Sequence, residues 1–514
     1  MQNKNKNMGE KMKKNYAFLS LIISIFTLLA ACSNKTSNSD ENKKNSTDSK
    51  TTELTMAFLA FGPPPKDLEL VQNEINKLTK DKINATVKLL PINASQYTQQ
   101  TNLMLSSREK LDLLITGNIP GFLDYSGQAV KGQLYPLDNL IGKYGKGISR
   151  ALGSKYIGSS KIGGKTYGIP TVRDLAGDRS LIMRKDLVDK YKIDIAKIKS
   201  LDDVEAVLKT IKENEPNVYP LMPGQVGAAT LVDGVSLPEG DPLGDNLGVL
   251  LDSSKLEVSN YYESNEYRDL LKVARNWYKQ GYILPGASTN KDAAESLMKA
   301  KKIFSFIQSS KPGIETQVSK NVGFEVVSVP LTPVSTNTQK VTGFMWAVPE
   351  FAQNPEKSVQ LLNLLYSDKD LVNLIDWGIE GKHYVKTDNG VIDYPAGVDA
   401  NTSGYALNSG FQFGNQFLSY VWKGDSRNIW KEMDSFNKNA KASKALGFLF
   451  DSSPVKTEMA AVTNVINQFK GAIENGMVDP KTELPKFQER LKAAGIEKIV
   501  KEKQKQLDKW AEEN

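Results

Sequence analysis

The chain has 514 residues, of which 40% are hydrophobic and 24% charged, and its formal net charge is +7. A chain of this length and composition can bury a sizeable core and normally divides into more than one unit, so we expect two lobes. The basic excess does not indicate a nucleic-acid partner, because the lysines are scattered and no aromatic-rich basic strip accompanies them. With one histidine, His383, and one cysteine, Cys32, the sequence also disfavours a zinc site.

The first 31 residues follow the order of a bacterial secretory signal peptide, which we expect to be removed. Basic residues precede an apolar run from Tyr16 to Ala31, and small residues lead into Cys32. The tetrapeptide Leu29 to Cys32 resembles the lipobox of bacterial lipoproteins, which implies that Cys32 carries a lipid anchor. The alternative is a short membrane helix around a buried cysteine, but the run is too short to span a bilayer comfortably. Residues 32–53 are mostly polar after Cys32 and are predicted to form a flexible tether.

The region after the tether predicts alternating strands and helices. Apolar runs near 54–61, 85–92 and 111–116 have strand length, and the segments between them carry helical spacing. This order predicts a parallel sheet with right-handed crossovers. Ligands of such sheets lie beyond the carboxyl ends of the strands, so Phe61 to Pro65 and Gly117 to Pro120 are expected at the mouth of a site.

A second α/β region follows further along the chain. Its predicted elements are helices over 201–213 and 267–279 and strands over 303–308 and 324–331. The proline- and glycine-rich stretch 220–244 is predicted to be loop. After an apolar segment at 343–348, Asn354 is expected to cap a helix that starts at Pro355. The C-terminal segment 481–514 predicts two charged amphipathic helices interrupted near Gly495.

Short catalytic motifs give no indication of an enzyme. Neither a Gly-x-Ser-x-Gly elbow nor a Gly-x-x-x-x-Gly-Lys-Ser/Thr phosphate loop occurs in the sequence. Ser435 to Lys438 matches the Ser-x-x-Lys pattern of penicillin-binding enzymes, but the companion motifs are absent and the match reads as chance. No acidic cluster has the spacing of a calcium loop. We therefore expect a protein that is not an enzyme and that requires no metal or cofactor.

Several segments, taken in order, resemble the extracellular solute-binding lipoproteins of ATP-binding-cassette importers, in particular the carbohydrate-binding branch (family 1). These segments are Asp112 to Gly117, Lys165 to Pro170, Met183 to Leu187, and Gly343 to Pro349 with Asn354 to Lys357. A long Firmicute subgroup of the family is resembled by Trp377 to Tyr384, which contains Gly-Ile-Glu-Gly-Lys. Leu446 to Asp451 and Thr463 to Val465 resemble that subgroup's distinctive C-terminal region.

The resemblance implies an α/β, two-lobed periplasmic-binding-protein-like fold (type II) with the ligand cleft between the lobes. It places hinges near residues 170, 342 and 405. Lobe 1 would then comprise 54–170 with about 343–405, and lobe 2 about 171–342 with about 406–514. A ligand that bridges the lobes stabilises the closed state, which a membrane permease recognises. The expected protein is a monomer, held by its lipid on the outer face of the cytoplasmic membrane.

A sugar cleft needs aromatic platforms together with polar side chains that direct hydrogen bonds. The candidate ligand-binding residues are Phe61, Asn118, Arg173, Asp174, Gln225, Trp346, Trp377, Glu380, Lys382, Tyr384, Phe411, Gln412 and Asn415, with Trp422 as a further platform. Core packing is the alternative for each aromatic residue, and an ion pair or a solvated turn is the alternative for the charged ones. His383 is expected to be a hydrogen-bonded structural residue.

These observations favour a membrane-anchored receptor that captures an oligosaccharide and delivers it to the permease subunits of an importer, without turnover. One alternative keeps the transport role but changes the solute to a peptide or another small polar molecule. A lipid-anchored glycoside hydrolase would need two carboxylates facing one cleft. An adhesion or scaffold lipoprotein would show an exposed apolar patch in place of a closable cleft.

Overall fold

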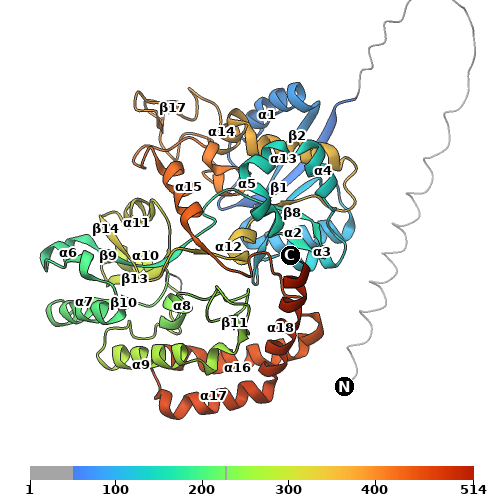
Figure 1. The fold of residues 1–514 in the computed structure, drawn as a ribbon. Coiled ribbons are helices and arrows are strands. Elements are labelled where there is room, and N and C mark those ends of the chain that lie inside the picture. Colours follow the sequence, from blue (N-terminus) through green and yellow to red (C-terminus); the bar gives the residue numbers. More distant parts are fainter. Residues whose placement is uncertain (1–49, 226–228, 514) are drawn as a thin grey trace, which may run out of the picture. The chain divides into compact units, whose positions relative to one another are not determined.

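The computed structural model describes residues 50–225 and 229–513, and its strands gather mainly into two sheets (Figure 1). The signal peptide, Cys32 and most of the tether lie outside the described residues. The first strand begins at Thr52, slightly earlier than the predicted start at Leu54, so the folded region includes the end of the predicted tether. None of the described helices is long and apolar enough to cross a membrane.

The first sheet has five strands in the order β2-β1-β3-β16-β8. Their bounds are β1 (Thr52–Ala60), β2 (Ala85–Asn93), β3 (Leu113–Thr116), β8 (Gly168–Pro170) and β16 (Met345–Ala347). The crossover helices α1 (Leu68–Ile83) and α2 (Ala94–Ser107) join the parallel strands β1, β2 and β3, which confirms the predicted arrangement. β16 runs antiparallel to both β3 and β8. The start of β16 therefore lies beside the carboxyl ends of β3 and β8.

The second sheet has four strands in the order β10-β13-β9-β14. They are β9 (Asp178–Arg184), β10 (Tyr219–Met222), β13 (Ile303–Ser310) and β14 (Val326–Pro330). β10 and β13 are parallel, and β9 is antiparallel to β13. The predicted helices are present as α7 (Leu201–Asn214) and α9 (Asn265–Lys279). The stretch 220–244 is not wholly loop, because it contains most of β10 and the short helix α8 (Leu231–Val235).

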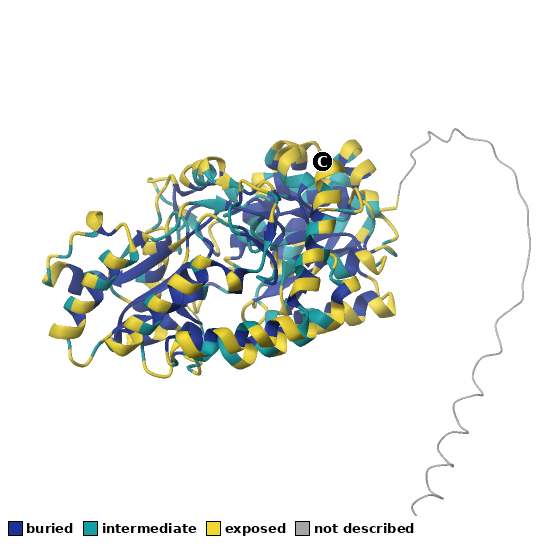
Figure 2. Cartoon of the chain, turned by 60° about the horizontal axis from the view of Figure 1, so that its bottom comes forward, coloured by how far each residue is buried: buried dark blue, intermediate teal, exposed yellow. Residues whose placement is uncertain are grey.

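Shorter helices complete the two regions. The first core is covered by α3 (Tyr125–Val130), α4 (Asp138–Tyr144), α5 (Lys146–Gly158), α13 (Pro355–Ser367) and α14 (Lys369–Trp377). The second region contains α6 (Lys185–Lys190), α10 (Ala294–Lys299) and α11 (Ile314–Val322). Figure 2 shows the strands as buried, while the outer faces of the surrounding helices are exposed.

The C-terminal part of the chain is helical. It comprises α15 (Ile429–Asn439), α16 (Lys456–Glu474), α17 (Pro480–Ala494) and α18 (Ile496–Glu513). Gly495, whose φ is 97°, ends α17 in the left-handed region that a glycine adopts without strain, which confirms the predicted interruption. α16, α17 and α18 contribute side chains to the same core as the second sheet, and Figure 1 shows α16 and α17 beside α9.

Candidate ligand-binding site

Strand ends of the first sheet converge at one edge. Phe61 follows β1 directly, and its side chain is 64% exposed although the strand before it is buried. Gly117 follows β3, and Gly343 lies just before β16. A Cβ atom on Gly117 would lie only 2.0 Å from the carbonyl oxygen of Gly343, so only glycine allows the two backbones to approach this closely.

Three phenylalanines form an aromatic cluster at this edge: Phe61, Phe344 and Phe411. The ring centroids of Phe61 and Phe411 are 5.9 Å apart, and those of Phe344 and Phe411 are 5.1 Å apart. Phe344 and Phe411 are half-buried, whereas Phe61 is exposed. The aromatic cluster thus combines rings held by their neighbours with an open apolar face, which suits the C–H face of a sugar ring.

Gln412 and Trp346 hold the aromatic cluster from beneath. The Gln412 amide donates to the carbonyl of Leu59 at 2.9 Å and accepts from the Leu59 N–H at 3.0 Å. The Trp346 indole donates to the Gln412 carbonyl at 2.6 Å. Both side chains are 0% exposed. The expectation that Trp346 offers a stacking face and that Gln412 bonds a ligand therefore needs correction, because packing and backbone hydrogen bonds occupy both side chains.

Arg173 and Asp174 connect the aromatic cluster to the second sheet. The Arg173 guanidinium lies 5.2 Å from the Phe344 ring centroid and donates to Asp174 at 2.6 Å. Lys311, which follows β13, approaches the other carboxylate oxygen of Asp174 at 3.1 Å. Burial tends to raise the pKa of Asp174, but the charges of Arg173 and Lys311 outweigh it and hold that pKa below its ordinary value. The carboxylate is therefore ionised and fixed between two cations.

The segment that leaves β8 is tied to two distant parts of the chain. The side-chain amide of Asn437, on α15, donates to the Arg173 carbonyl at 2.7 Å and accepts from the Leu175 N–H at 2.9 Å. Thr336 donates to the Leu175 carbonyl at 2.6 Å, and Gly177 pairs with Ser335. Hydrogen bonds therefore interlink three segments, which we call the crossing segments: residues 171–177, 335–343 and 437–445.

Lys340 is half-buried among these crossing segments. Its ammonium group donates to the Gly177 carbonyl at 2.8 Å and to the Ser335 carbonyl at 2.9 Å. Burial, together with the nearby charge of Arg179, lowers its pKa to about 8. Lys340 thereby joins the first two crossing segments with charge-assisted hydrogen bonds.

Two of the remaining polar candidates, Asn118 and Asn415, already have protein partners. The Asn118 amide accepts from the Ser126 hydroxyl at 2.9 Å and donates to Thr342 at 3.2 Å. Asn415 caps a short turn by accepting from the Phe417 N–H at 3.0 Å. Gln225 follows β10 and is exposed, at the edge of the second sheet.

The other four candidates lie around α14, where their contacts do not involve the aromatic cluster. The Trp377 indole is almost fully buried, donates to Ser419 at 2.8 Å and packs on Trp422. Glu380 pairs with Lys386 at 2.8 Å, and Lys382 pairs with Asp67 at 3.1 Å. A pocket of about 400 Å³ here, which we call the α14 pocket, is lined by Glu74, Lys77, Leu78, Asp370, Asn373, Leu374, Gly378, Ile379, Glu380, Tyr384, Lys386 and Tyr420.

His383 has the structural role that the sequence suggests. Its Nδ1 accepts from the Ile379 N–H at 2.8 Å, so the ring proton is assigned to Nε2, which lies 3.1 Å from Asp67. The hydrogen bonds from His383 and then Lys382 hold the pKa of Asp67 below its ordinary value. This network anchors the turn after Trp377 to the start of α1.

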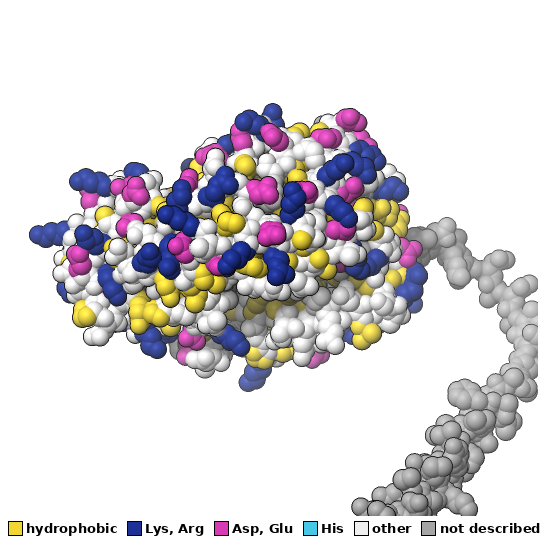
Figure 3. Space-filling model, turned by 90° about the horizontal axis from the view of Figure 1, so that it is seen from below, with side chains coloured by type: hydrophobic (Ala, Val, Ile, Leu, Met, Phe, Trp, Pro, Cys, Tyr) yellow, Lys and Arg dark blue, Asp and Glu magenta, His cyan; other side chains and the backbone are white. Residues whose placement is uncertain are grey.

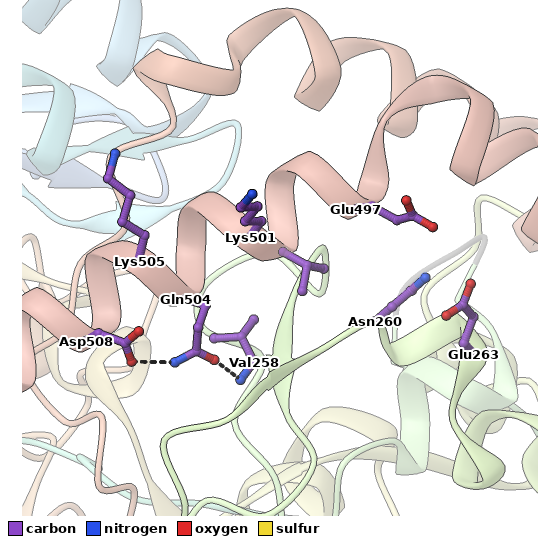
Figure 4. A pocket seen from close by; sticks show the side chains of 9 residues that line it. Val258, Asn260, Glu263, Glu497, Lys501, Gln504, Lys505 and Asp508 are labelled. Carbon is purple, nitrogen blue, oxygen red and sulfur yellow. Dashed lines mark hydrogen bonds between the residues drawn. The ribbon is translucent and has the colours of Figure 1, made fainter.

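A second pocket, of about 560 Å³, lies against α18 (Figure 4). The Gln504 amide there accepts from the Val258 N–H at 2.6 Å and donates to Asp508 at 2.7 Å.

Within the described parts of the chain, no three His, Cys, Asp or Glu side chains are grouped to hold a metal ion. Figure 3 shows basic and acidic side chains intermixed on one face of the molecule, with no continuous basic strip.

Sequence reasoning missed three residues of this region: Phe344, Lys311 and Arg179. Phe344 lies inside the apolar segment 343–348, where the pattern does not distinguish a ring that faces the core from one that faces a ligand. Lys311 directly follows β13 and Arg179 lies near the start of β9, and their positions depend on strand order, which local pattern does not define. The signal that would have found Lys311 is its place directly after an apolar strand.

Comparison with known proteins identifies two matching families. Residues 63–372 match the family described as bacterial extracellular solute-binding protein, and residues 444–512 match a domain of unknown function, DUF3502. A carbohydrate ABC transporter substrate-binding protein of Streptococcus pneumoniae is 29% identical over 512 residues, covering 97% of this chain and 98% of the relative.

Solved structures agree with these matches. The N-glycan transport solute-binding protein of S. pneumoniae is 27% identical, with a TM-score of 0.78 over 89% of this chain and 98% of that one. The same protein in complex with Man5GlcNAc is 26% identical, with a TM-score of 0.66 over 90% and 99% of the two chains. An alginate-binding protein, 19% identical with a TM-score of 0.59 over 90% and 98%, shares the fold. The chain described here thus has the two-lobed α/β fold and belongs to the bacterial extracellular solute-binding protein family.

Proposed function

We propose that this protein binds an oligosaccharide and presents it to the permease of an ATP-binding-cassette importer. The observation that carries the proposal is the aromatic cluster, in which Phe61 is exposed at a strand end while Phe344 and Phe411 support it. A ligand that covers this apolar ring removes apolar surface from water, which is favourable in free energy. The adjacent Arg173 and Asp174 provide the polar groups that orient a sugar.

The first candidate ligand is a glycan that contains mannose and N-acetylglucosamine. The related N-glycan transport protein has been solved with Man1GlcNAc and with Man5GlcNAc, and its identity to this chain is 26% in both complexes. The proposal takes this ligand class only as a starting point, because the ligand depends on the residues of the site as well as on the fold.

Lobe closure is the proposed mechanism. The three crossing segments, 171–177, 335–343 and 437–445, are the proposed hinges, and a ligand that contacts both lobes would stabilise the closed form. The proposal places the third hinge at the end of α15 rather than near 405, because Tyr405 and Phe413 are buried in the first core. Lobe 1 would then be 54–170 with about 343–436, and lobe 2 about 171–342 with about 437–514.

The membrane anchor is also a proposal. The signal peptide pattern and the lipobox-like tetrapeptide ending at Cys32 support a monomeric lipoprotein on the outer face of the cytoplasmic membrane. Binding without turnover is part of the proposal, and the family match supports it; the bound glycan is expected to be released intact to the permease.

A thermal-shift screen of the purified protein tests the function. Man5GlcNAc, other oligosaccharide classes and short peptides would be added, and each glycan would be recovered and analysed. A ligand present at one hundred times its Kd adds about 2.7 kcal/mol to the native state, which raises Tm visibly. A shift for a glycan that is recovered intact supports the proposal. Peptide shifts without glycan shifts, or glycan cleavage, would contradict it.

A further inference from the structure

The second sheet has its own converging edge. β10 and β13 are parallel, and β9 is antiparallel to β13 with Arg179 opposite Ser309. The amino end of β9 therefore lies at the same edge as the carboxyl ends of β10 and β13. Ligands of α/β sheets bind at such an edge, outside the carboxyl ends of parallel strands.

Arg179 stands at this edge without a carboxylate partner. Its side chain is exposed, and Nη1 donates to the Ser309 hydroxyl at 2.9 Å. Among the described residues, no carboxylate lies within 4.0 Å of its guanidinium, whereas Arg108, Arg173 and Arg184 each pair with one. The charge of Asp233 reaches Arg179, but Lys470 engages that carboxylate at 2.6 Å.

Arg179 uses one N–H of its guanidinium in the hydrogen bond to the Ser309 hydroxyl. An arginine remains charged under all ordinary conditions, so its unused N–H donors are available for a ligand.

Ion pairs connect this edge with the aromatic cluster. Lys311, which follows Ser310 at the end of β13, pairs with Asp174 at 3.1 Å. Asp174 pairs with Arg173, whose guanidinium lies over the Phe344 ring. The edge that carries Arg179 and the aromatic cluster thus meet through one ion-pair chain.

We propose that Arg179 is a ligand-contacting, specificity-determining residue that donates to two adjacent oxygens of the bound glycan. The inference rests on the proposed function and extends it to the second sheet. Ser309 accepts from Arg179, so its own hydroxyl proton can donate beside the remaining N–H donors of the guanidinium. Adjacent oxygens occur in a vicinal diol and in a carboxylate, and the guanidinium fork matches both.

Calorimetric titration with two probes shows whether Arg179 binds a vicinal diol or a carboxylate. Man5GlcNAc supplies vicinal hydroxyls, and an oligo-uronate supplies carboxylates. The variants are R179A and R179K, with R268A and R268K as matched controls, because Arg268 is also exposed and bonds one neutral side chain, Asn265. We expect R179A to weaken binding about 10- to 100-fold and R179K about tenfold, while both controls stay within about twofold.

The outcomes separate this inference from the proposed function. If R179A loses affinity for Man5GlcNAc, Arg179 binds a pair of hydroxyl groups. If R179A loses affinity for the oligo-uronate, and wild-type binding depends strongly on salt, Arg179 binds a carboxylate. If the wild-type protein binds a glycan and R179A binds it within about twofold, the role of Arg179 is overturned while the receptor function stands. If the wild-type protein binds no glycan, both fail.

A second variant protects the test against misfolding. Ser309→Ala leaves the charge of Arg179 in place and removes only the hydroxyl that accepts a hydrogen bond from its guanidinium. We expect this variant to keep the wild-type Tm and to weaken binding about two- to fivefold. Unchanged affinity of S309A, together with an R179A variant that fails to fold, would also overturn the proposal.

Discussion

The aromatic cluster and the α14 pocket contain the same kinds of side chain in different states. In the aromatic cluster, Phe61 is open to solvent and Arg173 lies over the ring of Phe344. Around the α14 pocket, Trp377 is buried on Trp422, and Glu380 pairs with Lys386. Both regions contain candidate residues in the sequence, but of the two only the aromatic cluster exposes a large apolar side chain, Phe61, to solvent. The difference teaches that an unsatisfied surface marks a site better than residue type does.

The largest expected effect separates stability from binding. Trp377→Ala removes a buried indole and its hydrogen bond to Ser419, so it should lower the free energy of unfolding by about 3–5 kcal/mol. Glycan affinity at a temperature where the variant is folded should remain within about twofold of the wild type. Denaturant unfolding and calorimetric titration measure the two quantities. A large loss of affinity would bring Trp377 back into the site.

A pH effect tests the packing around α14. Burial raises the pKa of Asp376 to about 6, although Ser409 and Ser419 donate to its carboxylate. Because this pKa is raised in the folded state, the stabilising contribution of protonated Asp376 is full below about pH 4 and is lost as pH rises to about 6. Asp376→Asn should therefore gain about 1–3 kcal/mol relative to the wild type between pH 4 and pH 7.

Denaturant unfolding of the two proteins at a series of pH values measures that difference. A stability difference that does not change between pH 4 and pH 7 would contradict a raised pKa for Asp376.

Removal of the exposed ring tests the aromatic cluster itself. Phe61→Ala should weaken glycan binding about tenfold, because the ligand loses an apolar face, and should leave Tm nearly unchanged. Leu103→Ala is the matched control, since Leu103 is 66% exposed and lies on α2. If both variants bind like the wild type, Phe61 is not part of the site.

The smallest expected effect concerns the surface ion pair beside the α14 pocket. Glu380→Gln should change the free energy of unfolding by less than about 0.5 kcal/mol, because an exposed pair with Lys386 contributes little. Glycan affinity should not change. A fall in affinity of more than about fivefold in calorimetric titration would place the ligand in the α14 pocket instead.

The local sequence pattern was sufficient to predict many of the helices and strands. The strands and helices from 54 to 116, the helices near 201 and 267, and the break at Gly495 all follow from apolar spacing and glycine. Pattern could not reveal that β16 inserts between β3 and β8, because the two pairings join residues at least 175 positions apart, the separation of Met345 and Pro170.

The candidate site was only partly predictable for the same reason. Phe61 became a candidate because it ends a predicted strand, and Arg173 because it follows the segment expected to lead into the first crossing between the lobes; both remain predictions. Trp346 and Gln412 were misjudged because composition does not distinguish an aromatic or amide group that faces a ligand from one that supports its neighbours. Arg179 required the order of the second sheet, which only the structure supplies.

A crystal structure of the protein with Man5GlcNAc is the most direct test of where a glycan binds. The account predicts density for a sugar ring against Phe61 and Phe411, with polar groups of the glycan near Arg173. Density in the α14 pocket, beside Tyr384 and Glu380, with the aromatic cluster free of sugar would contradict it.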